Sequence, residues 1–142
     1  MQRCSCCNAR LNGASLCPRC GADFGRALHC EHMANRWLSV CLQTLAEDHQ
    51  DLAVAAVRRS LSFKHTPAAR MMRDFLIHHQ YQSLFDQISR KHWQEAQQSL
   101  IRLQRLGGES DALHRFSAMI EHLSSESSHT PRMSTDRSRR SG

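Results

Sequence analysis

The sequence predicts a mainly α-helical protein that carries a small, separate unit at its N-terminal end. Apolar residues recur at helical spacing between residues 31 and 123, and this stretch contains no run of β-branched residues. The first 28 residues are instead rich in cysteine, glycine and arginine, and residues 124–142 contain one apolar side chain. These changes in composition divide the chain into segments 1–28, 31–123 and 124–142.

The N-terminal segment contains one short pattern twice. Residues 4–11 and 17–24 both read C-x-x-C-[N/G]-A-x-[apolar], thirteen positions apart. In such a knuckle the two cysteines point at one metal ion, and the chain turns sharply after the second. Asn8 and Gly21 suit that turn, because Asn and Gly reach positive φ at the least cost. Cys6 falls outside the register. The cysteines that match it, and are predicted to bind the metal, are Cys4, Cys7, Cys17 and Cys20.

Four thiolates are enough for a closed tetrahedral zinc site. Residues 1–26 therefore resemble a short zinc ribbon, which implies one structural Zn²⁺ per chain. Four cysteines leave no coordination position open for a catalytic water. The knuckle at residues 17–22 is also similar to one in rubredoxin, an iron protein, so iron is the alternative metal. Against iron, the spacer of nine residues between the knuckles is far shorter than in rubredoxin, and the aromatic core is missing.

A secreted disulfide scaffold is the other interpretation of seven cysteines in a small chain. The odd number of cysteines argues against it, as does a start (Met-Gln-Arg-Cys) without an apolar stretch of signal-peptide length. We therefore expect reduced thiols and a cytoplasmic location. No segment approaches the ~20 apolar residues of a membrane span, so no membrane association is expected.

Turn signals divide residues 31–123 into about six expected helices. Thr66 is a good N-cap for a helix with Pro67 at its first position. The pair Gly107-Gly108 marks the end of a helix, and Ser110 marks the start of the next. The apolar stripes expected to face inward run over residues 33–45, 52–61, 71–76, 81–88, 93–103 and 113–123.

Two of these helices match each other, residues 54–61 aligning with residues 93–100 at an offset of 39. The second resembles the first helix of a degenerate tetratricopeptide repeat, because Trp93, Ala96 and Leu100 occupy its W-x-x-[small]-x-x-x-[apolar] positions. The residue after Ala96 is a glutamine, however, the closing proline is absent, and the offset exceeds the usual repeat of about 34 residues. The resemblance implies an array of helical hairpins, with an irregular bundle as the alternative.

The net charge of +6 is concentrated at the two ends of the chain. The tail at 124–142 is basic and too polar to form a core, so it is expected to be disordered. The first segment carries four arginines, which are Arg3, Arg10, Arg19 and Arg26. A second metal site could include His29, Cys30, His32 and Cys41, although capping or packing roles are the stronger interpretation of these residues.

The sequence contains no Ser-His-Asp signature, phosphate-binding glycine loop, H-E-x-x-H or paired-carboxylate motif, so an enzyme is not expected. The favoured interpretation is a zinc-binding adaptor whose helical body binds a protein partner. The alternative is a nucleic-acid-binding accessory or regulatory protein that uses the basic ribbon and tail. Candidates for an exposed docking groove are Leu38, Leu42, Tyr81 and Phe85.

Overall fold

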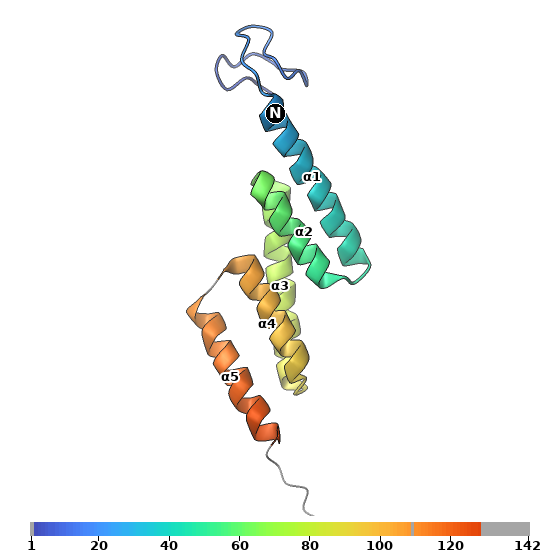
Figure 1. Ribbon diagram of the computed structural model, residues 1–142, viewed down its shortest axis with the longest axis vertical. Coiled ribbons are helices and arrows are strands. Elements are labelled where there is room, and N and C mark those ends of the chain that lie inside the picture. Colours follow the sequence, from blue (N-terminus) through green and yellow to red (C-terminus); the bar gives the residue numbers. More distant parts are fainter. Residues whose placement is uncertain (1, 109, 129–142) are drawn as a thin grey trace, which may run out of the picture.

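The computed structural model describes residues 2–108 and 110–128. This part of the chain forms an N-terminal unit without regular strands, followed by five helices (Figure 1). The mainly α fold class is therefore confirmed for the described residues. The helices are α1 (Gly25–Ala46), α2 (Gln50–Phe63), α3 (Pro67–Ser89), α4 (Trp93–Gly107) and α5 (Asp111–Ser128).

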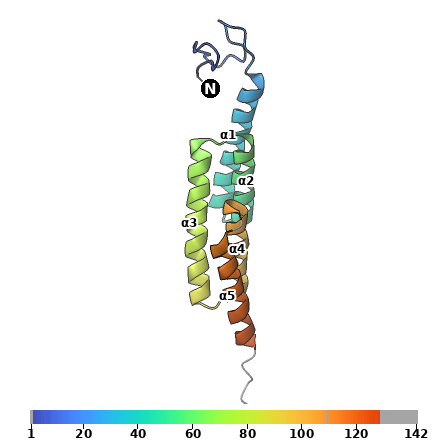
Figure 2. The same ribbon diagram turned by 90° about the vertical axis from the view of Figure 1, so that its left-hand side faces the viewer.

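The described part of the molecule is elongated. Figure 1 shows the N-terminal unit at the tip of α1, beyond the other helices, and α5 at the opposite end. In Figure 2, α3 stands along one side and the other helices lie along the other side. Among the described residues, the N-terminal unit adjoins the helical body at the first turns of α1, where Leu28 packs against its core. This bears on its stability below.

The helices pack most closely as two hairpins, α1 with α2 and α3 with α4. The two hairpin turns are alike. Each contains one residue with positive φ, Asp48 at 59° and Lys91 at 62°. In each turn the following histidine donates its backbone N–H to a carbonyl five residues earlier, at 2.8 Å for His49 and 2.9 Å for His92. These equivalent positions lie 43 residues apart, so the structural repeat differs from the offset of 39 expected from the sequence.

The expected helix count of about six was wrong, because two of the expected helices form the single 23-residue helix α3. No glycine or proline interrupts the chain between Leu76 and Tyr81. The buried face of α3 passes through Leu76, Gln80 and Leu84. Gln80 is fully buried, and its amide nitrogen donates to Gln50 Oε1 at 2.8 Å. A polar residue in the middle of the buried stripe made the apolar pattern look interrupted.

Two clusters of buried side chains form the core of the helical body. The first lies mainly between α1 and α2 and includes Cys41, Val54, Val57 and Leu76. The second joins α3, α4 and α5, and its buried members are Leu84, Ala96, Leu100, Leu103, Leu113 and Ile120. Neither cluster contains a residue of the N-terminal unit.

Polar contacts connect the two hairpins. The Arg102 guanidinium on α4 donates to both carboxylate oxygens of Asp51 on α2, at 2.9 and 3.0 Å, and to Gln50 Oε1 at 3.3 Å. These hydrogen bonds lower the pKa of the Asp51 carboxyl, which favours the ionised pair in the folded protein. Gln50 therefore links α2 to α3 through Gln80 and to α4 through Arg102.

Two helices cross the segment boundaries that were expected from the sequence. Helix α1 begins at Gly25, within the expected segment 1–28. Helix α5 continues to Ser128, so residues 124–128 are helical although the disordered tail was expected to begin at 124. The remainder of that tail, 129–142, lies outside the described residues. In the part of the chain that the structure describes, no helix combines the length and apolar character needed to cross a bilayer.

Candidate metal centre

The repeated sequence pattern is also a structural repeat. In both copies the N–H of the first cysteine donates to the carbonyl of the alanine five residues later, Cys4 to Ala9 at 2.8 Å and Cys17 to Ala22 at 2.9 Å. Each copy also forms one antiparallel bridge, Arg3 with Arg10 and Leu16 with Asp23. Every one of these positions lies thirteen residues from its counterpart, as the sequence pattern does.

The turn after each pair of cysteines has the expected conformation. Asn8 has a φ of 59° and Gly21 a φ of 71°, and both N–H groups donate at 2.9 Å to the carbonyl of the first cysteine in their copy. The prediction that these two residues adopt positive φ is confirmed. The turn folds the backbone back so that both cysteines of a copy approach one point.

The four cysteines of the two copies lie close together. All their sulfur atoms are within 4.8 Å of one another. The Sγ atoms of Cys4 and Cys20 are 3.6 Å apart, as are those of Cys7 and Cys17. A regular tetrahedron with metal–sulfur bonds of about 2.3 Å has edges of about 3.8 Å, whereas a disulfide bond is about 2.05 Å long. The sulfurs therefore fit a four-coordinate metal ion, and they are compatible with zinc.

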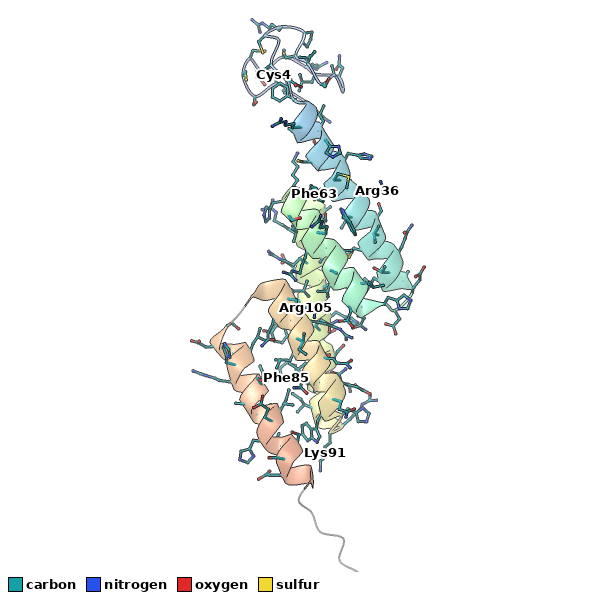
Figure 3. The ribbon with its side chains drawn as sticks, viewed as in Figure 1. Cys4, Arg36, Phe63, Phe85, Lys91 and Arg105 are labelled. Atoms are coloured by element: carbon teal, nitrogen blue, oxygen red, sulfur yellow. The ribbon has the colours of Figure 1, made fainter. Side chains whose placement is uncertain are left out.

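Burial differs systematically among the four sulfur ligands. The first cysteine of each copy, Cys4 or Cys17, is buried, whereas Cys7 is half-buried and Cys20 is exposed. The small core around the buried pair contains Leu11 and Phe24, which are again equivalent positions of the two copies; Leu28 of α1 is packed against it. The candidate metal centre thus lies at the middle of its own small unit, seen around Cys4 in Figure 3.

Backbone N–H groups favour the ionised form of the two buried thiols. Burial raises the pKa of Cys4, but hydrogen bonds from the N–H groups of Cys7 and Cys6, at 3.4 and 3.3 Å, outweigh it and lower that pKa to about 6. The N–H groups of Cys20 and Arg19 likewise lower the pKa of Cys17. Thiolates are the form that binds metal ions, so the backbone prepares these two ligands before a metal arrives.

The other two thiols hold their protons more strongly. The N–H of Ala22 favours the Cys20 thiolate, but the neighbouring sulfurs of Cys7, Cys17 and Cys4 outweigh it and raise the pKa of Cys20 to about 12. The pKa of Cys7 is also raised. Four sulfurs this close together can all lose their protons only when a cation balances their charge. The geometry and the proton affinities therefore both match a site completed by a metal ion.

The residues considered for a second metal site are not brought together. Within 2–108 and 110–128, the quartet of cysteines is the one group of Cys, His, Asp or Glu side chains arranged to hold a metal ion. Cys41 lies instead in the core between α1 and α2, where burial raises the pKa of its thiol. Cys6, which the register left out of the metal site, is exposed.

The residues expected to form a docking groove are dispersed. Leu42 and Phe85 are 49% and 56% exposed, but they belong to α1 and α3. Leu38 is half-buried, and Tyr81 packs against the core of α3, α4 and α5. The sequence analysis missed the neighbours of Phe85 on α5, which are described below, because they come from a helix that is distant in the chain.

Comparisons with known proteins returned no match: no protein-family model, no curated protein and no solved structure is similar to this chain.

The assignment of the cysteines to the metal centre can be tested by replacing each of two adjacent cysteines with serine. Cys7→Ser is expected to lose bound metal, because the remaining cysteines cannot complete a four-thiolate site. Cys6→Ser is the matched control and should keep one metal ion per chain, because this thiol is exposed and does not belong to the quartet. Elemental analysis of the two purified variants measures the result. Retention of metal by Cys7→Ser together with its loss from Cys6→Ser would contradict the assignment.

Proposed function

We propose that this protein is a non-enzymatic adaptor, with a structural zinc ion in the N-terminal unit and a protein-binding surface on the helical body. The observation that carries the proposal is a cluster of exposed apolar side chains where α3 meets α5. The chemistry of the metal centre supports a structural role, because four sulfur ligands leave no open position at which a substrate or water could bind.

Zinc is the metal that best suits the site. Its filled d shell imposes no geometry of its own, and four-cysteine structural sites with tetrahedral geometry are typical of it. Iron takes the same ligands, so elemental analysis of protein purified from its native host must decide between them. Iron would also give the protein a red colour.

Four apolar residues form the cluster, and an arginine borders it. Together they are here named the α3–α5 patch, which consists of Phe85, Ala112, Phe116, Met119 and Arg115. The Phe85 and Phe116 rings meet edge to face, with centroids 5.7 Å apart and planes at 78°. Phe85 nevertheless remains 56% exposed and Met119 37% exposed. A hollow of about 240 Å³ is lined by the four α5 residues of the patch, and one of these, Phe116, contacts Phe85. Clusters of large exposed apolar side chains mark interaction surfaces in many proteins.

The shape and charge of the α3–α5 patch favour an amphipathic helix as the bound segment. Aromatic and methionine side chains are adaptable partners for the apolar face of such a helix. Arg115 borders the hollow and forms no ion pair with any other described residue. A partner helix with apolar residues at i, i+3 or i+4 and a carboxylate beside them would complement both features.

A pair of double variants tests this function. Phe85→Ala with Met119→Ala removes two exposed side chains of the patch and should abolish capture of the partner from extracts of the native host. Met71→Ala with Phe75→Ala is the control, because these residues are also exposed, at 73% and 52%, but lie on another part of α3. It should capture the partner as the unmodified protein does.

Cross-linking followed by mass spectrometry should then locate the captured segment on residues of α5. The segment is expected to be an acidic amphipathic helix. Equal capture by both double variants, or cross-links that avoid α5, would refute the proposed docking surface. Zinc content should be the same in all samples, so that a loss of capture cannot be assigned to the metal centre.

A further inference from the structure

Two arginines face each other in the first copy of the repeated unit. Arg3 and Arg10 form its antiparallel bridge. The hydrogen bond from Leu11 N–H to Gln2 O, at 3.0 Å, lies on one side of this pair, and the 2.8 Å bond donated by Cys4 lies on the other. Arg3 and Arg10 therefore form a non-hydrogen-bonded cross-strand pair, which is the type of pair in which the two side chains come closest.

This arrangement is unfavourable for the isolated protein, because like charges directly opposite each other across two strands repel. Neither arginine forms an ion pair with a residue in 2–108 or 110–128. The second copy shows that the fold does not need the charges, since Leu16 and Asp23 occupy the equivalent positions. The Arg3 guanidinium donates one hydrogen bond, to Asn8 O at 3.3 Å, so among the described residues most of the donors of the two arginines remain available. A bound anion could accept from them and would remove the repulsion.

A hollow suited to an anion adjoins the pair. It has a volume of about 490 Å³ and is lined by Gln2, Arg3, Arg10, Asn12 and Gly13. Asn12 and Gly13 form a tight turn with φ values of 47° and 84°, closed by the hydrogen bond from the residue after Gly13 to Leu11 O at 2.8 Å. Apart from Gly13 and its two chain neighbours, no atom lies within 4 Å of where a Gly13 side chain would begin, so this position of the turn faces open space.

We propose that this hollow binds the phosphodiester backbone of a nucleic acid. Guanidinium groups match phosphate oxygens through paired hydrogen bonds, and two of them flank the hollow. Both arginines are exposed, so a single small anion would gain little there. A polyanion gains more, because binding releases its condensed counterions. The chain also keeps a positive net charge, about +4 once four thiolates and a divalent metal ion are added to the formal +6, and this attracts a polyanion over longer distances.

This site goes beyond the proposed adaptor function and uses the other end of the molecule. The N-terminal unit and α5 lie at opposite ends in Figure 1, so a nucleic acid and a protein partner would occupy separate surfaces. The sequence placed Arg3 and Arg10 among the four arginines of a ribbon that could bind nucleic acid. It did not reveal their pairing beside one hollow, because that pairing depends on the backbone hydrogen bonds of the folded repeat.

The test uses the full-length, metal-loaded protein and a fluorescent oligonucleotide, as a single strand and as a duplex of the same sequence. Affinity is measured by anisotropy over a series of salt concentrations. Arg3→Gln with Arg10→Gln should weaken binding at least tenfold at low salt. If each arginine contacts one phosphate, the variant should also reduce the salt dependence, with the log–log slope smaller by about 1.4 for the single strand and about 1.8 for the duplex.

The matched control is Arg36→Gln with Arg58→Gln, which removes the same charge from exposed positions on α1 and α2. Figure 3 shows Arg36 on α1. The control variant should bind nearly as tightly as the unmodified protein. Equal weakening by both double variants would overturn the proposal, because the effect would then come from net charge. Failure of the unmodified protein to bind either oligonucleotide, or displacement of both by millimolar inorganic phosphate, would overturn it as well. Metal content and circular dichroism should be unchanged in every variant, which excludes unfolding as the cause.

Discussion

Removal of the metal with a strong chelator is expected to unfold residues 2–24 while leaving most of the helical circular dichroism signal intact. The N-terminal unit has a very small core, in which Leu11 and Phe24 are the large apolar side chains that are buried. Burying these two contributes about 3–6 kcal/mol. Ordering about twenty backbone residues costs several times more than this, and the binding of a structural metal ion, which is coupled to folding, supplies the missing free energy. Without the metal, the unit therefore cannot remain folded.

The helical body should survive because its own core is independent of that unit. Its two clusters of buried residues lie among the five described helices, and α1 contributes Leu28 as its contact with the core of the N-terminal unit. Hydrogen exchange with peptide resolution distinguishes the two parts: residues 2–24 should lose protection, and α2 to α4 should retain it. Readdition of zinc should restore protection. Complete loss of helicity on chelation would show that the N-terminal unit is integrated into the helical core.

The candidate metal centre could be predicted from the sequence because its determinants are local. The C-x-x-C spacing and the positive φ of Asn8 and Gly21 are properties of short segments, and the thirteen-residue register excluded Cys6 without any knowledge of the fold. The structural equivalence of the two copies, position by position at a spacing of thirteen residues, follows from the same local pattern. The cross-strand repulsion of Arg3 and Arg10 needs one further step, the pairing of the two strands, and was therefore missed.

The helical body was predicted less well, because its details depend on contacts between distant residues. Gln80 looks like an interruption of the apolar stripe until Gln50, on another helix, is placed beside its amide group. The sequence comparison aligned two similar helices at an offset of 39, whereas the similarity of the two hairpin turns, at an offset of 43, is visible only in their backbone conformation. Of the turn residues, His49 and His92 are identical, but Asp48 and Lys91 share a conformation and not a side-chain type.

The second large effect is expected on helix α3, where substitutions of two neighbouring residues should change the free energy of unfolding by very different amounts. The sequence pattern placed Leu84 and Phe85 in one apolar stripe, and it also offered Phe85 as a candidate for an exposed groove. In the structure Leu84 is fully buried in the core of α3, α4 and α5, whereas Phe85 is 56% exposed. Leu84→Ala should lower the free energy of unfolding by about 3 kcal/mol, because it leaves a cavity that the surrounding helices cannot fill completely.

Phe85→Ala removes a larger side chain but should cost only about 1 kcal/mol, mainly through loss of its edge-to-face contact with Phe116. Urea unfolding of the two variants measures the difference, which corresponds to roughly 10 °C in the melting temperature of Leu84→Ala against a few degrees for Phe85→Ala. Leu84→Met nearly conserves the side-chain volume, so its free energy of unfolding should be within about 1.5 kcal/mol of that of the unmodified protein. This variant is the control for a substitution that leaves no cavity. Equal losses for Leu84→Ala and Phe85→Ala would mean that Phe85 belongs to the core. The α3–α5 patch would then lose its central residue, because a side chain needed for folding cannot also be free to receive a partner helix.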